Sequence, residues 1–133
     1  MNLRNLLLWV LRIVPAVILL QTLYFKFSAH PQSVKLFTAI GMEPWGRVGT
    51  GVAELIAAVL LLIPVTSAIG ALMGVGLMSG ALYFHVTGIG IAFDGDYGLF
   101  TMALITFFCC LFLLVLLRKK ILHGGIPFIR SQK

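Results

Sequence analysis

Three ionisable side chains lie where their types and positions could do chemistry together. Glu54 is the one charged residue of an otherwise apolar stretch, Lys26 lies near the end of the apolar stretch before it, and His85 lies near the end of the one after it. If these stretches are membrane helices, a charged group near a helix centre costs about 2.5–3.5 kcal/mol and usually faces the interior of a helix bundle. These residues are therefore the first candidates for a functional site.

Together the three groups predict a polar pocket. Glu54 would accept a proton or anchor a hydrogen bond, Lys26 would be its electrostatic partner, and His85 can titrate near neutral pH. Such a pocket could hold a quinone-like head group, because quinone carbonyl oxygens need hydrogen-bond donors. The alternative is a structural ion pair that keeps the helices in register, and the residues alone do not decide between the two.

Small residues surround Glu54 in the sequence. Gly51 is three residues before it, and two alanines follow it at three and four residues. Because small residues let helices approach closely, Glu54 is expected to face other helices and not lipid. A helix rises about 1.5 Å per residue, which gives the depth of each side chain below the membrane surface. The depth is roughly 6 Å for Lys26, roughly 10 Å for Glu54 and roughly 3–8 Å for His85, all from the same surface. The three side chains are thus expected in one leaflet.

The composition is that of an integral membrane protein with a single domain over residues 1–133. Hydrophobic residues make up 60% of the chain, charged residues make up only 11%, and the mean hydropathy is +1.07. A soluble domain has about 25% charged residues. The net charge of +6 does not indicate nucleic-acid binding, because seven of the ten lysines and arginines lie near the chain ends and form no basic face on a soluble surface.

The apolar pattern predicts an all-α membrane fold, a bundle of four transmembrane helices. A short amphipathic helix over residues 31–41 is expected to lie on the membrane surface between the first two spans, because a span needs about 20 residues. Residues 1–12 are either a separate interfacial helix or the first turns of the first span. The predicted spans and the tail after them cover residues 13–30, 47–63, 68–87, 97–117 and 118–133.

The placement of positive charge predicts the orientation of the chain. The chain ends carry seven lysines or arginines, the turn at residues 64–67 carries none, and the two opposite loops with their flanks carry three. Because cytoplasmic segments carry the excess of positive charge, both termini are expected in the cytoplasm. We expect the inner or plasma membrane.

The third predicted span is rich in glycine. Two glycine pairs have the four-residue spacing that lets helices pack closely, either within one bundle or between copies. They are Gly70 with Gly74 and Gly76 with Gly80. In the fourth span Cys109 and Cys110 are adjacent, and neighbouring side chains on a helix point about 100° apart, so they are not expected to form a disulfide. We interpret them as small hydrophobic residues and leave any other role open.

No metal site is predicted. Glu54, His85 and His30 are too few candidate ligands for one. The spacing of Asp94 and Asp96 matches the first two ligands of a calcium loop, but the other ligands of such a loop are absent at the required spacings. Either aspartate is instead expected to cap the fourth span.

Short motifs along the chain occur in an order that can be compared with known families. They are Arg12, Phe25-Lys26-Phe27, Ile40-Gly41-Met42, Gly51-Val-Ala-Glu54-Leu55, Leu60-Leu-Leu-Ile-Pro64 and His85. This order resembles the DoxX-like family of small four-helix membrane proteins. The resemblance covers about residues 10–117 and depends mainly on the positions of Lys26, Glu54 and His85.

The resemblance implies a function more loosely than a fold. The protein that gives the family its name is the small subunit of a thiosulfate:quinone oxidoreductase, and relatives are linked to membrane oxidoreductase complexes. The resemblance therefore implies a subunit or accessory protein of such a complex, with quinone as the candidate cofactor. Its partners would be the lipid bilayer and other membrane or redox proteins, or a second copy of the chain.

Two alternatives stay open. Other similar proteins are chaperones that assemble membrane receptors, which implies an assembly factor acting through helix contacts. A small transporter is the third possibility. A self-contained redox enzyme is less favoured, because the sequence has no Cys-x-x-Cys pair, no matched haem ligands and no nucleotide-binding loop.

Overall fold

The computed structural model describes residues 2–90, 92 and 97–124, and all of its regular elements in these ranges are helical. Four of the helical segments are long and apolar enough to cross a membrane. The predicted all-α membrane fold with four spans is therefore confirmed. In chain order the elements are α1 (Leu3–Phe27), α2 (Pro31–Ala39), α3 (Trp45–Leu62), the short helix η1 (Pro64–Thr66), α4 (Ser67–Phe84), the π-helical turn η2 (His85–Ile89) and α5 (Gly98–Gly124).

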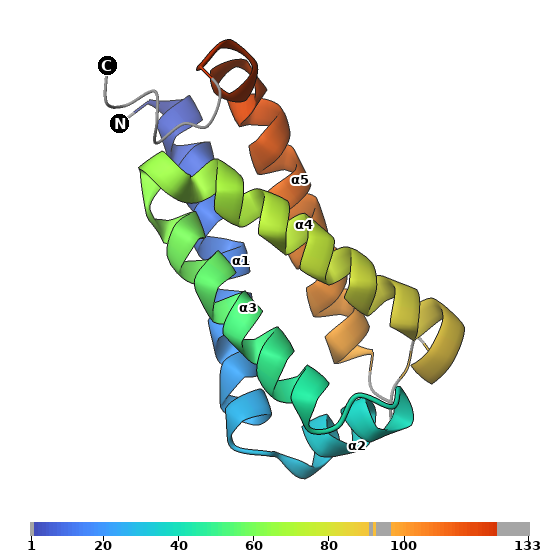
Figure 1. Cartoon of the computed structure of the whole chain (residues 1–133). Helices are drawn as coiled ribbons and strands as arrows, with labels where there is room; N and C mark the ends of the chain where they lie inside the picture. The colour runs from blue at the N-terminus through green and yellow to red at the C-terminus, as the bar shows by residue number, and fades with distance from the viewer. Residues whose placement is uncertain (1, 91, 93–96, 125–133) are drawn as a thin grey trace.

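The four long helices form two pairs, α1 with α3 and α4 with α5, and the pairs diverge toward α2. Helix α1 packs on α3 and α5, and α4 packs on α3 and α5. Figure 1 shows α3 and α4 meeting at their turn and separating toward the other end of the bundle, where α2 lies. The start of α1 and the end of α5 lie at the end opposite α2. This arrangement leaves room between the helices on the side of α2.

The core fills the part of the bundle where the helices converge. Its largest fully buried side chains include Leu19 of α1, Leu61 of α3 and Leu113 of α5. The lipid-facing sides of the same helices carry many exposed apolar side chains. That distribution is expected when the solvent around the bundle is a bilayer, because apolar side chains then gain nothing by being hidden.

The first helix begins ten residues earlier than the predicted span. Residues 3–12 are the first turns of α1, which is one of the two alternatives that the sequence left open. The side chain of Asn2 accepts a hydrogen bond from the backbone N–H of Asn5 at 2.8 Å, and this caps the helix start. Because the helix begins at Leu3, Pro15 lies inside it and not in its first turn, and Pro15 is buried.

The last helix continues beyond the predicted boundary at residue 117. It ends at Gly124, so the first seven residues of the predicted tail, 118–124, belong to the helix. Lysine and arginine have good helix propensity, so the basic run that begins at Arg118 marks the end of the membrane span without ending the helix. Residues 125–133 lie outside the described ranges, as do Asp94 and Asp96, the predicted caps of this helix.

The two glycine pairs of α4 have different surroundings. A Cβ atom at Gly70 would lie 2.6 Å from the backbone nitrogen of Leu61, and one at Gly74 would lie 2.6 Å from Sγ of Cys110. A Cβ atom at Gly76 or Gly80 would meet no atom within 4 Å. Within this chain, close contact to another helix is therefore seen at Gly70 and Gly74 and not at Gly76 and Gly80, and the packing role of the two pairs stays a prediction. Corresponding glycines of the two pairs are six residues apart, which turns the second pair to another face of the helix.

Candidate functional site

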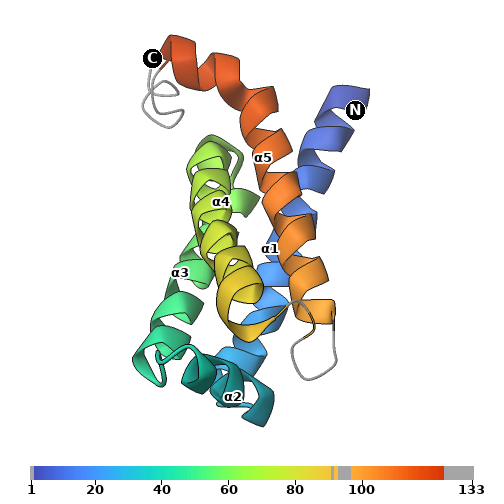
Figure 2. The ribbon, with the colours of Figure 1, turned by 90° about the vertical axis from the view of Figure 1, so that its right-hand side faces the viewer.

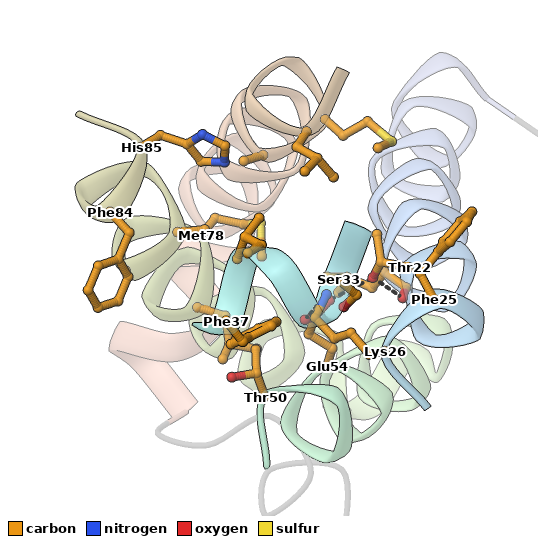
Figure 3. A pocket seen from close by; sticks show the side chains of 18 of the residues that line it. Thr22, Phe25, Lys26, Ser33, Phe37, Thr50, Glu54, Met78, Phe84 and His85 are labelled. Carbon is orange, nitrogen blue, oxygen red and sulfur yellow. Dashed lines mark hydrogen bonds and ion pairs between the residues drawn. The ribbon is translucent and has the colours of Figure 1, made fainter. Parts of the chain in front are cut away.

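A cavity of about 460 Å³ lies between the diverging helices, next to α2. All five α-helices contribute to its lining, which is mostly apolar. Figure 3 shows Phe37 and Met78 on its walls, with Lys26 and Glu54 together at one side and His85 across from them. Gly76 and Gly80 of α4 also line the cavity. The open space in front of them explains why a Cβ atom at either position would meet no other atom within 4 Å.

Lys26 and Glu54 form an ion pair at one side of the cavity. Lys26 Nζ lies 2.9 Å from Glu54 Oε1, and the two side chains are 14% and 4% exposed. Thr22 lies one turn before Lys26, and its Oγ1 is 2.9 Å from Glu54 Oε2. The Thr22 hydroxyl has one proton, which it donates either to Glu54 or to the carbonyl of Leu19 at 2.8 Å. Oε1 thus has Lys26 as its donor, and Oε2 has a donor when the Thr22 hydroxyl points toward it.

The helices bring this pair together through their register. Lys26 is in the last turn of α1, and Glu54 is in the middle of the adjacent α3. Gly51, one turn before Glu54, is buried against the ring of Phe27. The absence of a side chain at Gly51 lets the end of α1 approach α3, so the predicted small-residue face of Glu54 does pack against a helix.

Arg47 stabilises the same contact between the end of α1 and α3. This role was not identified from the sequence. The Arg47 side chain is buried, and Nε lies 2.9 and 3.0 Å from the two carboxylate oxygens of Glu43. Its Nη1 donates to the backbone carbonyl of Lys26. One guanidinium thus joins the last turn of α1 to the start of α3. The four-residue spacing of Glu43 and Arg47 was the available signal, since oppositely charged residues at this spacing often pair.

His85 lines the cavity but does not join the ion pair. Its Nδ1 lies 3.0 Å from the backbone carbonyl of Gly90, and its ring meets Phe100 edge to face at 5.6 Å between centroids. A carbonyl oxygen only accepts hydrogen bonds, so the geometry assigns the proton to Nδ1 and leaves Nε2 as an acceptor in the neutral ring. The sequence placed three groups in one cluster, whereas in the structure two are in contact and the third lies across the cavity.

The arrangement offers a ligand one strong donor and a large apolar surface. An ammonium group has three N–H donors, and the described residues give Lys26 one partner, Glu54. Lys26 therefore has N–H donors left for a ligand, and it is the charged donor on this side of the cavity. A matching ligand has an apolar body and an oxygen that accepts a hydrogen bond. A role of Lys26, Glu54 and His85 in binding such a ligand stays a prediction.

The family model described as DoxX-like matches residues 10–115. This range contains both residues of the ion pair and His85, and it ends within α5. No curated protein and no solved structure matches the chain.

Proposed function

Since this chain belongs to the DoxX-like family, we propose that it is a small subunit or accessory protein of a membrane oxidoreductase and that its cavity binds a quinone. The observation that carries this proposal is the apolar cavity with the Lys26 ammonium on its wall. Its volume of about 460 Å³ falls within the range of about 300–1,000 Å³ that is usual for small-molecule sites. The cavity is also the place where the helices of the bundle do not pack.

A quinone matches the groups that the cavity presents. Its ring is apolar and flat, and its two carbonyl oxygens accept hydrogen bonds without carrying charge. Lys26 supplies a donor for one carbonyl oxygen, and Glu54 keeps the ammonium neutralised when the site is empty. A neutral ligand fits better than an anion here, because the pair already has no net charge and a further buried charge would be costly.

The glycines of α4 favour the cavity over the alternative functions. Gly70 and Gly74 are used inside this bundle, against α3 and α5, and so they are not available to a partner helix. Gly76 and Gly80 line the cavity. No specific observation among the described residues supports an assembly factor that docks helices through α4, and none supports a transporter.

Filling the cavity is expected to weaken quinone binding. Gly80→Leu adds a side chain where a Cβ atom meets nothing within 4 Å, so the bundle should fold while the cavity loses volume. Isothermal titration calorimetry of the purified protein with a short-chain benzoquinone should give saturable binding that Gly80→Leu weakens at least about tenfold, or 1.4 kcal/mol.

The matched control for this experiment is Gly49→Leu. Gly49 lies on the exposed face of α3, outside the cavity, and a Cβ atom there also meets nothing within 4 Å. The control should bind the quinone as the unmodified protein does. Unsaturable binding to the unmodified protein, or equal affinity in the two leucine variants, would rule out the cavity as the quinone site.

We also propose that the membrane is the inner or plasma membrane, with both termini in the cytoplasm. The proposal is supported by the seven lysines and arginines near the chain ends and by the position of the start of α1 and the end of α5 at one end of the bundle (Figure 1). A fluorescent protein fused after residue 133 should be fluorescent, and an alkaline phosphatase fused there should be inactive. An active phosphatase fusion would reverse the orientation.

A further inference from the structure

We propose a second binding site, for an anionic phospholipid, in a groove between α1 and α5 at the end of the bundle opposite α2. The groove has a volume of about 260 Å³ and is lined by five apolar side chains. They are Leu7, Leu11, Phe112, Val115 and Leu116. In Figure 2 the two helices run side by side here and extend past the turn between α3 and α4. The groove lies apart from the quinone cavity and does not depend on its function.

The apolar lining suits an acyl chain. Three of the five lining residues, Leu7, Phe112 and Val115, are 45%, 57% and 44% exposed, so the groove opens to the bilayer and is not closed by the protein. Lining atoms of this kind make no hydrogen bonds, and a soluble polar ligand would gain nothing from them. A lipid chain lying along α1 and α5 would fill the space between the two helices.

Arg4 supplies a positive charge at the end of this groove. It precedes Leu7 by three residues and Leu11 by seven, so the three side chains share one face of α1. Its Nη2 donates to the backbone carbonyl of Leu116 at 3.1 Å, and the guanidinium thus reaches from α1 to α5. The charged group therefore lies beside the apolar lining, as a lipid phosphate would require.

Arg118 supplies a second guanidinium close to the first. Its Nη1 donates to the backbone carbonyl of Val115 at 2.8 Å. The two arginines thus bind the carbonyls of consecutive residues of α5, and both are exposed. A guanidinium has five N–H donors, and the described residues give each of these two groups one hydrogen bond. The remaining donors can bind a phosphate, which Arg does in a bidentate geometry.

The distribution of acidic residues makes an anion the matching ligand. The chain has four acidic residues. Glu43 and Glu54 lie toward the other end of the bundle, each paired with a cation, and the remaining two precede α5 in the sequence. No described carboxylate pairs with Arg4 or Arg118. Positive charge next to an open apolar groove fits the phosphate and acyl chain of one molecule, a phospholipid with net negative charge.

Tryptophan fluorescence can report on this groove directly. The chain has two tryptophans, Trp9 in the first half of α1 and Trp45 at the start of α3. Neither lines the groove, because Trp9 is two residues from both Leu7 and Leu11 and so points to another face of α1. Trp9→Phe with Trp45→Phe removes both, and Phe112→Trp then places a sole tryptophan in the groove lining. In this background the full chain is reconstituted in phosphatidylcholine bilayers that contain either brominated phosphatidylglycerol or brominated phosphatidylcholine. Bromine quenches tryptophan on contact, so the quenching curves give the relative affinity of the two lipids for the groove.

We expect phosphatidylglycerol to be preferred about tenfold, because two cations near the surface attract its charge. Arg4→Gln with Arg118→Gln should remove the preference. Arg130→Gln with Lys133→Gln is the control, since it removes the same two charges from the segment after Gly124 and should keep the preference. Adding inorganic phosphate should have no effect beyond that of an equal ionic strength of chloride.

Each other outcome overturns the proposal. Equal quenching by the two lipids would show that the groove does not select charge. A preference that survives loss of Arg4 and Arg118, or one that the control pair also removes, would assign the effect to general attraction by the basic chain ends. Specific competition by inorganic phosphate would make the ligand a soluble anion and not a lipid.

Discussion

Replacing Glu54 with alanine is expected to lower the free energy of unfolding by about 3 kcal/mol. The change leaves the Lys26 ammonium, whose side chain is only 14% exposed, without its anion. Removing one partner of a buried ion pair costs about 3–5 kcal/mol. We expect the lower value because Lys26 lies in the last turn of α1, from which its flexible side chain can extend toward the membrane surface. Unfolding in mixed detergent micelles, followed by circular dichroism, measures the change.

Two further variants assign this loss to the ion pair. Thr50→Ala changes another residue of the cavity wall, one turn before Glu54, and should cost about 1 kcal/mol or less because no charge is left unpaired. Methionine at both Lys26 and Glu54 should recover most of the stability, since apolar replacements of a buried pair are often neutral. If the double replacement is as unstable as Glu54→Ala, the unpaired ammonium is not the cause.

Gly70→Ala is expected to lower the free energy of unfolding by about 1–3 kcal/mol, the usual cost of an overpacked core. The new methyl group would lie 2.6 Å from the backbone nitrogen of Leu61 and 2.9 Å from the carbonyl carbon of Leu60. Backbone atoms cannot rotate away as a side chain can, so α3 and α4 must move apart. The same unfolding assay in micelles measures the loss.

Gly76→Ala is the control for that change, and it should have the opposite sign. A Cβ atom at Gly76 meets nothing within 4 Å, so the substitution adds helix propensity without a clash. Alanine is favoured over glycine by about 1 kcal/mol inside a helix. Similar losses at the two positions would mean that α4 does not use its glycines in the way the structure describes.

The sequence was sufficient to predict the fold and one contact of the candidate site. Long apolar stretches define spans because backbone groups in a bilayer must be paired within a helix. The cost of a charge in lipid predicted that Glu54 would face a partner, and the depth argument selected Lys26. These inferences depend on local composition and on the rise of a helix, both of which a sequence contains.

Other features depend on how the helices are rotated, which the sequence did not reveal. The depth argument placed His85 beside Glu54, but depth does not determine direction, and the ring lies across the cavity with Nδ1 bonded to Gly90. The same limit applies to Gly76 and Gly80, whose spacing matches that of the packing pair although they line the cavity. Hydrophobic periodicity also gives little help in α4, which is apolar on every side.

Arg47 was missed for a different reason. Near the start of a span, an arginine is usually read as a topology signal at the membrane surface. Its contact with the carbonyl of Lys26 joins residues 21 positions apart. Every residue has a backbone carbonyl, so the sequence does not indicate which one accepts the hydrogen bond. The volume and the largely apolar lining of the cavity could not be predicted either, because they arise from the divergence of the helix pairs and not from any one segment.

The proposed quinone site is tested most directly by an experimental density map of the full chain purified with a saturating short-chain benzoquinone. We predict one ring inside the cavity, with a carbonyl oxygen about 2.7–2.9 Å from Nζ of Lys26 and the ion pair to Glu54 still formed. A map with the cavity empty, or with the quinone bound only on the outside of the bundle, would contradict the proposed function.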